Sequence, residues 1–336
     1  MTAPFLDAKN PADIERAAQL LRAGEVVALP TETVYGLAAD AFNEAALRRV
    51  FEIKSRPFFD PLIVHVADWA MLEKLAQPNA RAKKLADAFW PGALTFVLPK
   101  KPEVPALVTA GKPTVAVRMP AHPAMRAVLK AAGIPLAAPS ANPFGYISPT
   151  CAAHVRDSLG ERQPHILDAG PCVHGIESTI IDLSDPDAPA RILRHGPVTR
   201  EMIETALGEI VDTSAPKAAT EPSPAGLPAP GLLKRHYSPQ TPVTLLSRGT
   251  PPPPCADNTR QAWVLLKRPR RPLQKPERTD LFFLSENGQM EQIAHNMFAM
   301  LRTLDKGGYS TLFVELPPRA GLGEALHDRL RRAAAR

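Results

Sequence analysis

The densest group of residues suited to chemistry is PTETVYGLAADA, residues 30–41. Thr31, Thr33 and Tyr35 alternate there with other residues. In an extended segment successive side chains point to opposite faces, so this spacing predicts that the three hydroxyl groups share one face and can hydrogen-bond a small polar ligand. Gly36 permits the turn that follows. The alternative is a β-turn in which threonine follows its ordinary conformational preference.

A second segment, KSRPFFDPLIVH (54–65), supplies two cations and a histidine. Lys54 and Arg56 precede prolines whose fixed φ stiffens the chain, so less entropy is lost when the cations clamp phosphate oxygens. His65 lies within the apolar run LIVHV, where an imidazole has to be hydrogen-bonded internally or used by a ligand. The alternatives are a solvated loop and a histidine satisfied in the core.

Polar residues also recur where the expected strands begin or end. In an α/β fold, polar groups gathered at strand ends line a cleft at the edge of the sheet. Each such residue is a weak signal singly, and together they predict a site. The candidates are Arg118, Ser140, Asn142, Ser148, Ser178, Thr179 and Arg194.

The elements that must position these residues follow one another through about residue 208. Apolar periodicity predicts helices that start near residues 11, 43, 67, 79, 123 and 199, and strands near 25–30, 61–66, 94–99, 114–120, 135–140, 165–170, 178–184 and 190–196. Helices join some strands and direct turns join others. This pattern predicts an α/β domain with a mixed, twisted sheet.

Residues 209–242 break the pattern. Proline makes up 38 of the 336 residues, about twice its ordinary usage, and part of this excess lies in SAPKAATEPSPAGLPAPG. Such a composition predicts an extended, semi-rigid linker. Beyond it, residues 243–336 contain four expected strands and two expected helices, which predicts a small three-layer, Rossmann-like α/β domain without the usual glycine-rich nucleotide fingerprints.

Composition excludes several classes of protein. The three cysteines lie far apart, so neither a disulfide framework nor a zinc knuckle is expected. The formal charge of +6 permits a polyanionic ligand without demanding a surface that coats nucleic acid. Asp7 and Lys9 lie where a secretory leader would be apolar, and no apolar run approaches the roughly 18 to 20 residues of a membrane span. We therefore expect a cytoplasmic protein that does not contact the membrane.

Six ordered motifs carry a family resemblance. They are P-T-E-T-V-Y-G-L, K-S-R-P-x-x-x-P-L-I-V-H, W-P-G-A-L-T-F-V, V-A-V-R-M-P, A-P-S-A-N and G-x-E-S-T-I. Together they closely resemble the YrdC-like family, the threonylcarbamoyl-AMP synthases. KRHYSP (234–239), followed by a small α/β domain, resembles the long form of these enzymes. The resemblance implies a YrdC-like catalytic domain over 10–208 with a concave cleft, a linker or strap over 209–242 and an additional C-terminal domain over 243–336.

The resemblance also implies an adenylyl transfer. L-threonine, bicarbonate or CO2, and ATP with Mg2+ on its triphosphate would give threonylcarbamoyl-AMP and pyrophosphate. A partner tRNA threonylcarbamoyl transferase complex would then modify adenosine 37 of tRNAs that read codons beginning with A. No residue has to act as a nucleophile, because the reaction depends on positioning in a water-poor cavity.

The family's binding residues map onto this chain one by one. The threonine subsite is expected at Thr31, Thr33, His65, Arg118, the backbone of Ala138, and Ser178. The nucleotide subsite is expected at Lys54, Arg56, Asp60, Thr114, Ser140, Asn142, Ser148, Arg194 and Tyr237, with Lys54 and Arg56 as the catalytic cations.

Two points in this mapping are hypotheses of their own. The strap that carries Lys234, Arg235, His236 and Tyr237 is predicted to lie over the cleft and exclude water from the carbamate, the alternative being a passive spacer. Asp60 stands where many relatives have Asn. Because a carboxylate near a triphosphate is repulsive, Asp60 is expected to face Mg2+ or the ribose rather than a phosphate.

Two other functions remain alternatives. A double-stranded RNA- or tRNA-binding regulatory protein would use the concave basic surface of this fold, although aromatic residues make up only 6% of the chain. KRPRRP (267–272) and RLRRAAAR (329–336) allow weak RNA or partner contact, with solvated faces the simpler interpretation. The second alternative is a carbamoyl-transfer domain of the hydrogenase-maturation type, which normally accompanies acylphosphatase and zinc-finger-like segments.

Overall fold

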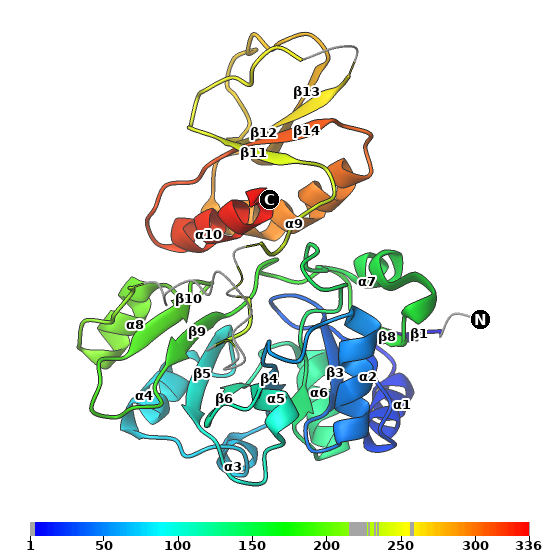
Figure 1. Ribbon diagram of the computed structural model, residues 1–336, viewed down its shortest axis with the longest axis vertical. Coiled ribbons are helices and arrows are strands. Elements are labelled where there is room, and N and C mark those ends of the chain that lie inside the picture. Colours follow the sequence, from blue (N-terminus) through cyan, green and yellow to red (C-terminus); the bar gives the residue numbers. More distant parts are fainter. Residues whose placement is uncertain are drawn as a thin grey trace.

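The protein folds around two separate sheets. The computed structural model describes residues 4–214, 227, 229–231, 233, 235–255 and 259–335. A ten-stranded mixed sheet with its helices forms the larger part, and a four-stranded parallel sheet stands beyond it along the long axis of the molecule (Figure 1). The mixed α/β architecture expected from the sequence is confirmed.

The larger sheet has the strand order β1-β8-β2-β3-β7-β4-β6-β5-β9-β10 and combines parallel and antiparallel pairs. Its strands are β1 (Phe5–Asp7), β2 (Val27–Leu29), β3 (Gly36–Asp40), β4 (Ile63–His65), β5 (Leu94–Pro99), β6 (Thr114–Arg118), β7 (Leu136–Ala137), β8 (His165–Asp168), β9 (Thr179–Asp182) and β10 (Arg191–Arg194). The helices of this part are α1 (Pro11–Arg22), α2 (Glu44–Lys54), α3 (Trp69–Glu73), α4 (Ala80–Phe89), α5 (Ala106–Thr109), α6 (Pro123–Ala132), α7 (Ala152–Leu159) and α8 (Arg200–Leu207), with the 3-10 turn Gly160–Arg162 after α7.

Side-chain caps fix where several helices begin. The side chains of Asn43, Asn79 and Thr199 accept hydrogen bonds from backbone N–H groups in the first turns of α2, α4 and α8. Gly208 ends α8 in the left-handed conformation that glycine adopts without strain. These polar residues at segment boundaries explain why the helix positions could be predicted from sequence.

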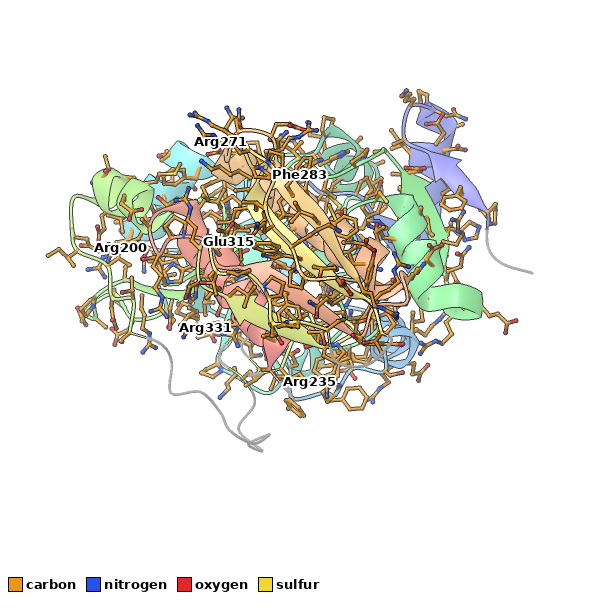
Figure 2. The ribbon with its side chains drawn as sticks, turned by 90° about the horizontal axis from the view of Figure 1, so that it is seen from above. Arg200, Arg235, Arg271, Phe283, Glu315 and Arg331 are labelled. Atoms are coloured by element: carbon orange, nitrogen blue, oxygen red, sulfur yellow. The ribbon has the colours of Figure 1, made fainter. Side chains whose placement is uncertain are left out.

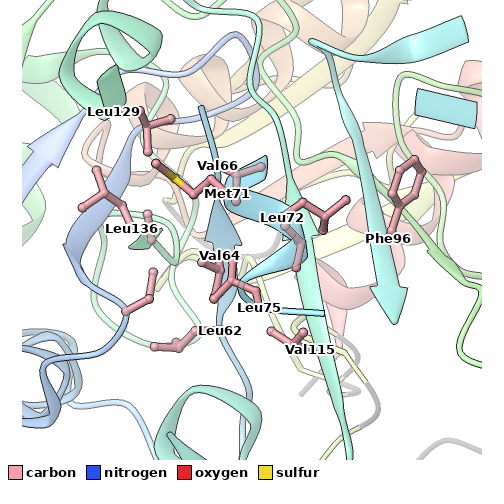
Figure 3. Packing of buried hydrophobic residues seen from close by; sticks show 14 of the residues in the cluster. Leu62, Val64, Val66, Met71, Leu72, Leu75, Phe96, Val115, Leu129 and Leu136 are labelled. Carbon is pink, nitrogen blue, oxygen red and sulfur yellow. The ribbon is translucent and has the colours of Figure 1, made fainter. Parts of the chain in front are cut away.

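The central strands β4 and β6 divide their side chains between the core and the opposite face. Val64 of β4 packs in the core with Met71 and Leu72 of α3, as Figure 3 shows. The neighbouring residue His65 points the other way, because side chains alternate along a strand. His65 is the register partner of Arg118 in parallel β6, so two predicted site residues lie side by side.

Four elements differ from the sequence-based expectation. Residues 36–40, expected as a turn, form β3 between β2 and β7, although glycine, alanine and aspartate are poor strand formers. The short strand β1 and the helices α5 and α7 were also not predicted. β1 pairs with β8, and β3 pairs with β7 as well as with the adjacent β2. Local sequence patterns do not report pairing with strands as distant as β7 and β8.

The smaller sheet has the order β11-β14-β12-β13. Val264 and Leu266 pack with the helices on one face, whereas Trp263 and Leu265 belong to a separate apolar cluster on the other face. Among the described residues, connecting segments rather than helices cover that second face; Figure 2 looks down on this sheet, to which the labelled Phe283 belongs. The elements are β11 (Val243–Leu246), β12 (Gln261–Lys267), β13 (Thr279–Ser285), α9 (Met290–Asp305), β14 (Thr311–Glu315) and α10 (Leu322–Ala334).

Helices α9 and α10 face the larger part of the molecule (Figure 1). Arg302 of α9 is buried and donates hydrogen bonds to the carbonyl oxygens of Ile147 and Ser148 and to the Ser158 hydroxyl. The Tyr146 hydroxyl donates to Asp305 at 2.8 Å. Polar contacts therefore join the two parts, and Ile147 and Ile176 of the larger part also belong to the apolar cluster around α9. Within the described ranges, no helix combines the length and the apolar character needed to cross a membrane.

Candidate functional site

A cavity lies where β4 and β6 meet the strap residues Pro230, Gly231, His236 and Tyr237. It has an internal volume of about 50 Å3 and is partly open to solvent. Its lining among the described residues is Thr31, Thr33, Val34, Gly36, Arg56, Pro61, Ile63, His65, Arg118, Ala138, Pro139, Ser140, Glu177, Ser178, Arg194, Pro230, Gly231, His236 and Tyr237.

All six residues predicted for the threonine subsite line this cavity. They come from five separate segments of the chain and are Thr31, Thr33, His65, Arg118, Ala138 and Ser178. The N–H of Ala138 donates to the Ile63 carbonyl at 3.0 Å, so its carbonyl is the backbone group left for a ligand. The structure therefore brings the predicted group together, while its contact with threonine stays a prediction.

Arg118 is held in place before any ligand arrives. Its Nε donates to the Gly92 carbonyl at 3.1 Å, and its Nη1 donates to the Thr33 hydroxyl at 2.8 Å. Its Nη2 pairs with Glu32 Oε1 at 2.6 Å. Burial is the largest single influence and opposes ionisation of Glu32, but the Arg118 charge and the hydrogen bonds to Glu32 together lower its pKa to about 2. The pair stays ionised, and two guanidinium N–H groups remain for a carboxylate.

His65 is neutral at ordinary pH. Burial and then the positive charge of Arg118 lower its pKa to about 3. Its Nδ1 is buried and has no hydrogen-bond partner among the described residues. A buried polar atom without a partner on a cavity wall is available to a ligand.

Arg194 is a buried cation of a different kind. Its Nε and Nη2 donate to the carbonyl and hydroxyl oxygens of Ser178, and its Nη1 donates to the Pro230 carbonyl at 3.2 Å. No ion pair joins it to a carboxylate within the described part of the chain. Arg194 therefore presents an uncompensated positive charge to the cavity, which suits an anionic ligand.

The residues predicted for the nucleotide subsite divide into two groups. Arg56, Ser140, Arg194 and Tyr237 line the cavity. The other five do not: they are Lys54, Asp60, Thr114, Asn142 and Ser148. Thr114 lies at the start of β6 and lines a separate small depression with Thr109 and Lys112. Contact between the nucleotide and these five residues stays a prediction.

Lys54 is occupied inside the protein. Its Nζ donates to the carbonyl oxygens of Ser140 and Asn142 at 2.5 and 2.6 Å. Burial and then the charge of Arg56 hold its pKa well below the ordinary value. Lys54 thus fastens the end of α2 to the loop that carries Ser140, and it supports a cavity wall instead of reaching a phosphate.

Asp60 is paired with Arg56 rather than exposed to the cavity. Its Oδ2 lies 2.9 Å from Arg56 Nη2, and both side chains are buried. The same guanidinium also donates to the carbonyls of Asp60 and Pro61. Asp60 therefore orients the cation that lines the cavity. The metal-side or ribose contact that we expected for Asp60 would require it to leave this pair.

The prediction that three hydroxyl groups share one face is wrong for Tyr35. Its hydroxyl donates to the Gly170 carbonyl at 2.8 Å and accepts from the Ala169 N–H, away from the cavity. The Thr31 hydroxyl donates to the Val34 carbonyl at 2.6 Å, which makes residues 31–34 a turn. Because a turn replaces the extended strand, the period of two does not hold.

The strap lies against both parts of the molecule. Ala229 packs with Ile63 and Leu193 of the larger part, whereas the Tyr237 ring stacks on Phe298 of α9 with centroids 5.5 Å apart. Tyr237 has a left-handed backbone, with φ of 61°, and its buried hydroxyl has no partner among the described residues. Such strain in a buried residue is typical of functional sites. Lys234 lies outside the described residues.

Comparison with known proteins decides the family. A sequence model for Sua5, YciO and YrdC proteins, described as telomere recombination, matches residues 19–196. The model of the threonylcarbamoyl-AMP synthase C-terminal domain matches residues 198–335. The chain belongs to the Sua5/YrdC family.

Relatives in this family match almost the whole chain. Threonylcarbamoyl-AMP synthase of Bacillus subtilis is 39% identical over 97% of this chain and 94% of its own length. The Pyrococcus abyssi enzyme is 39% identical over 96% of this chain and 94% of its own. The crystal structure of Pyrococcus abyssi Sua5 complexed with L-threonine is 35% identical and covers 99% of this chain and 98% of that one, with a TM-score of 0.86.

The sequence did not assign every residue that shapes the site of this Sua5/YrdC protein. Glu177 lines the cavity, yet Ser178 and Thr179 were the residues of this motif that were predicted, and Thr179 is not in the lining. The sequence signal for Glu177 was a carboxylate within the largely apolar segment GIESTIID. Arg329 was interpreted as part of a solvated basic face, which is wrong: its side chain is fully buried and pairs with Glu177. Only the packing of α10 against the larger part shows this.

The cavity offers no obvious set of metal ligands. Within the described ranges no group of three His, Cys, Asp or Glu side chains could hold a metal ion. Glu177 is paired with Arg329, and Asp60 is paired with Arg56. These residues do not fit a resident metal site. Mg2+ keeps several waters and binds phosphate oxygens, so it would enter as part of MgATP.

Proposed function

We propose that the protein is an L-threonylcarbamoyladenylate synthase. The observation that carries the proposal is the cavity itself, in which the predicted threonine group and the cations Arg56 and Arg194 share one enclosed space. Full-length similarity to threonylcarbamoyl-AMP synthases supports it, as does the L-threonine bound to the Pyrococcus abyssi relative.

The proposed reaction has two bond-forming steps. The threonine amine, after losing a proton, attacks the carbon of CO2 derived from bicarbonate and gives a carbamate. A carbamate oxygen then attacks the α-phosphorus of ATP, the bond from this phosphorus to the bridging oxygen breaks, and pyrophosphate leaves. The protein would supply positioning and charge rather than a covalent group.

The charges of the described residues suit this chemistry. Arg118, with its two free N–H groups, would hold the threonine carboxylate as a fork. Arg56 and Arg194 would hold charge on the phosphates. His65 and His236 carry little positive charge, because burial lowers the pKa of both. Neutral imidazoles do not repel the threonine ammonium group, and their ring nitrogens can accept hydrogen bonds from it.

The water-poor surroundings would protect the carbamate, which decomposes in water. The three arginines are only 3 to 7% exposed, and His236 and Tyr237 close part of the cavity. The same burial argues against the RNA-binding alternative at this position, since these cations do not face a nucleic-acid backbone. The product would pass to a transferase complex that modifies adenosine 37 of tRNA.

The test is pyrophosphate release from ATP. We expect release by the full chain only when L-threonine, bicarbonate and Mg2+ are all present, with threonylcarbamoyl-AMP detected by mass spectrometry. Serine and valine serve as controls, because serine lacks the methyl group and valine lacks the hydroxyl. Release that does not depend on threonine would refute the proposal.

A further inference from the structure

A buried arginine of the C-terminal domain reaches the cavity wall. Arg329 lies in α10 and its side chain is 0% exposed. Its Nε donates to Glu177 Oε2 at 3.0 Å, and its Nη1 donates to Asp328 Oδ2 at 3.0 Å. Since Glu177 lines the cavity, one contact separates this second-domain side chain from the ligand space.

Glu177 needs a cation beside it. Its Oε1 accepts a hydrogen bond from the Ser148 hydroxyl, and its side chain is buried. A carboxylate on the wall of a cavity that receives phosphates repels them unless its charge is balanced. Arg329 is the sole cation within ion-pair distance of Glu177 in the described part of the chain.

The same guanidinium also contacts the strap. Its central carbon lies 5.4 Å from the centroid of the Tyr237 ring, which is in range for a cation–π contact. The same Tyr237 ring also stacks on Phe298 of α9. Arg329 therefore joins Glu177, on the cavity wall, to Tyr237, on the strap.

The need to hold the two domains together does not by itself explain why Arg329 is buried beside Glu177. Arg302 of α9 already joins them, and its partners are carbonyl and hydroxyl oxygens without charge. The exposed pair of Lys306 and Asp157 joins them as well, at 2.8 Å. What distinguishes Arg329 is that its partner is an acid lining the cavity.

We infer that Arg329 is a positioning residue for the nucleotide: it neutralises Glu177 and fixes Tyr237, and the C-terminal domain thereby makes the cavity receptive to the phosphates of ATP. The inference rests on the proposed function in taking ATP as the ligand. Ser148, Arg194 and Tyr237, which surround Glu177 and Arg329, are the residues that the family resemblance assigns to the nucleotide.

The experiment measures ATP binding to the full chain by calorimetry, and KM values by pyrophosphate release. Arg329→Met leaves Glu177 unpaired, so ATP affinity should fall about tenfold or more, with KM for threonine nearly unchanged. Adding Glu177→Gln to Arg329→Met should recover most of the affinity, because the carboxamide carries no charge. Lys306→Met, which removes an exposed interdomain cation, is the matched control and should bind ATP as the wild type does.

A second measurement separates charge from architecture. If Arg329→Met is poorly folded by circular dichroism, Arg329→Lys replaces it. Lysine keeps the charge, so it should retain more ATP affinity than an equally folded Arg329→Gln.

Three outcomes count against the inference. Unchanged ATP affinity in Arg329→Met would overturn it, and so would a defect that Glu177→Gln does not relieve, because that defect would be purely structural. If the wild type binds no ATP, the proposed function itself fails and the inference falls with it. The wild-type measurement therefore distinguishes the two failures.

Discussion

Single residues in this cavity are prepared by partners that do not themselves meet the ligand. Arg118 shows this most clearly, since Gly92, Thr33 and Glu32 each hold one nitrogen of its guanidinium. A side chain fixed in advance loses little entropy when it binds a carboxylate. The buried Glu32 thus acts on the substrate through Arg118.

The fork of Arg118 leads to a first prediction. Arg118→Lys keeps the positive charge but loses the planar pair of donors, so KM for L-threonine should rise about tenfold or more while KM for ATP changes little. Steady-state pyrophosphate release at varied threonine measures this. Arg48→Lys, on the exposed face of α2, is the control for an arginine-to-lysine change. Equal threonine KM values in the two variants would contradict a role of Arg118 in binding the carboxylate.

Asp60 provides a second prediction at the same scale. Because its carboxylate orients Arg56 and does not line the cavity, Asp60→Asn should leave the Mg2+ dependence of the reaction unchanged. KM for ATP should rise, because Arg56 loses the charged partner that orients it. The Tm should fall, because a buried ion pair is broken. A shifted Mg2+ requirement would instead favour the contact with the metal side that the sequence suggested.

At the scale of elements, the strap is the part that closes the cavity. Tyr237 and Ala229 pack on opposite parts of the molecule, and the Ser238 N–H donates to the Gly145 carbonyl at 2.9 Å. The strap is thus attached at several points rather than spanning free space. Its contacts belong to the closed arrangement, and opening would have to break them.

Removing the aromatic side chain of the strap tests its role. Tyr237→Ala should lower turnover and increase ATP hydrolysis that is not coupled to threonylcarbamoyl-AMP formation, because water gains access to the carbamate. The ratio of pyrophosphate released to product formed is the measurement. Tyr309→Ala, which removes an aromatic ring from the C-terminal domain beside Phe282, is the control. Kinetics unchanged from the wild type would identify the strap as a passive spacer.

Gly231 tests the position of the strap rather than its chemistry. A Cβ at this residue would lie 2.7 Å from the Tyr237 hydroxyl and 3.1 Å from Arg194 Nη1. Gly231→Ala should therefore displace both groups and reduce turnover severalfold. Gly249→Ala is a matched control, because Gly249 has the same φ of 77° and nothing within 4 Å of the added atom. If the two variants behave alike, backbone strain alone explains the loss.

Local elements were more predictable than contacts between them. Asn43, Thr199 and Gly208 marked helix boundaries in the sequence, and the structure has α2 and α8 there. The residue types of the threonine group were also recognisable from the motifs. The bonds of Lys54 to Ser140 and Asn142 join positions 86 and 88 residues apart, so no local spacing could reveal them. The burial of Arg329 was not predicted for the same reason, because its partner Glu177 lies 152 positions away in the sequence.

At the scale of the whole molecule, the C-terminal domain supports the cavity without lining it, among the described residues. The ten-stranded sheet supplies the threonine group, and α9 and α10 hold the strap against it. Closure also buries histidines. His65 lies on the sheet and His236 on the strap, and both line the same cavity. The acid stability of the protein should therefore report on the closed arrangement.

Burial is the main cause that lowers the pKa of both histidines, followed by nearby cations: Arg118 for His65, and Arg56 for His236. In the unfolded chain both would titrate near their ordinary pKa of about 6.5. Below that pH the unfolded state binds protons that the folded state does not, so the free energy of unfolding should fall as pH falls. The loss is about 1.4 kcal/mol per pH unit for each such histidine, and for His65 it continues to about pH 3.

Urea unfolding at a series of pH values between about 7.5 and about 5 checks this slope. His65→Gln removes one titrating group, so below about pH 6 its slope should be smaller than that of the wild type by about 1.4 kcal/mol per pH unit. Its free energy of unfolding at neutral pH is a separate quantity and need not match. The slope depends only on the difference in protons bound by the folded and unfolded states. A slope for His65→Gln equal to that of the wild type would therefore show that His65 is already protonated in the folded protein. His65 would then be a cation facing the threonine amine rather than a neutral hydrogen-bond acceptor.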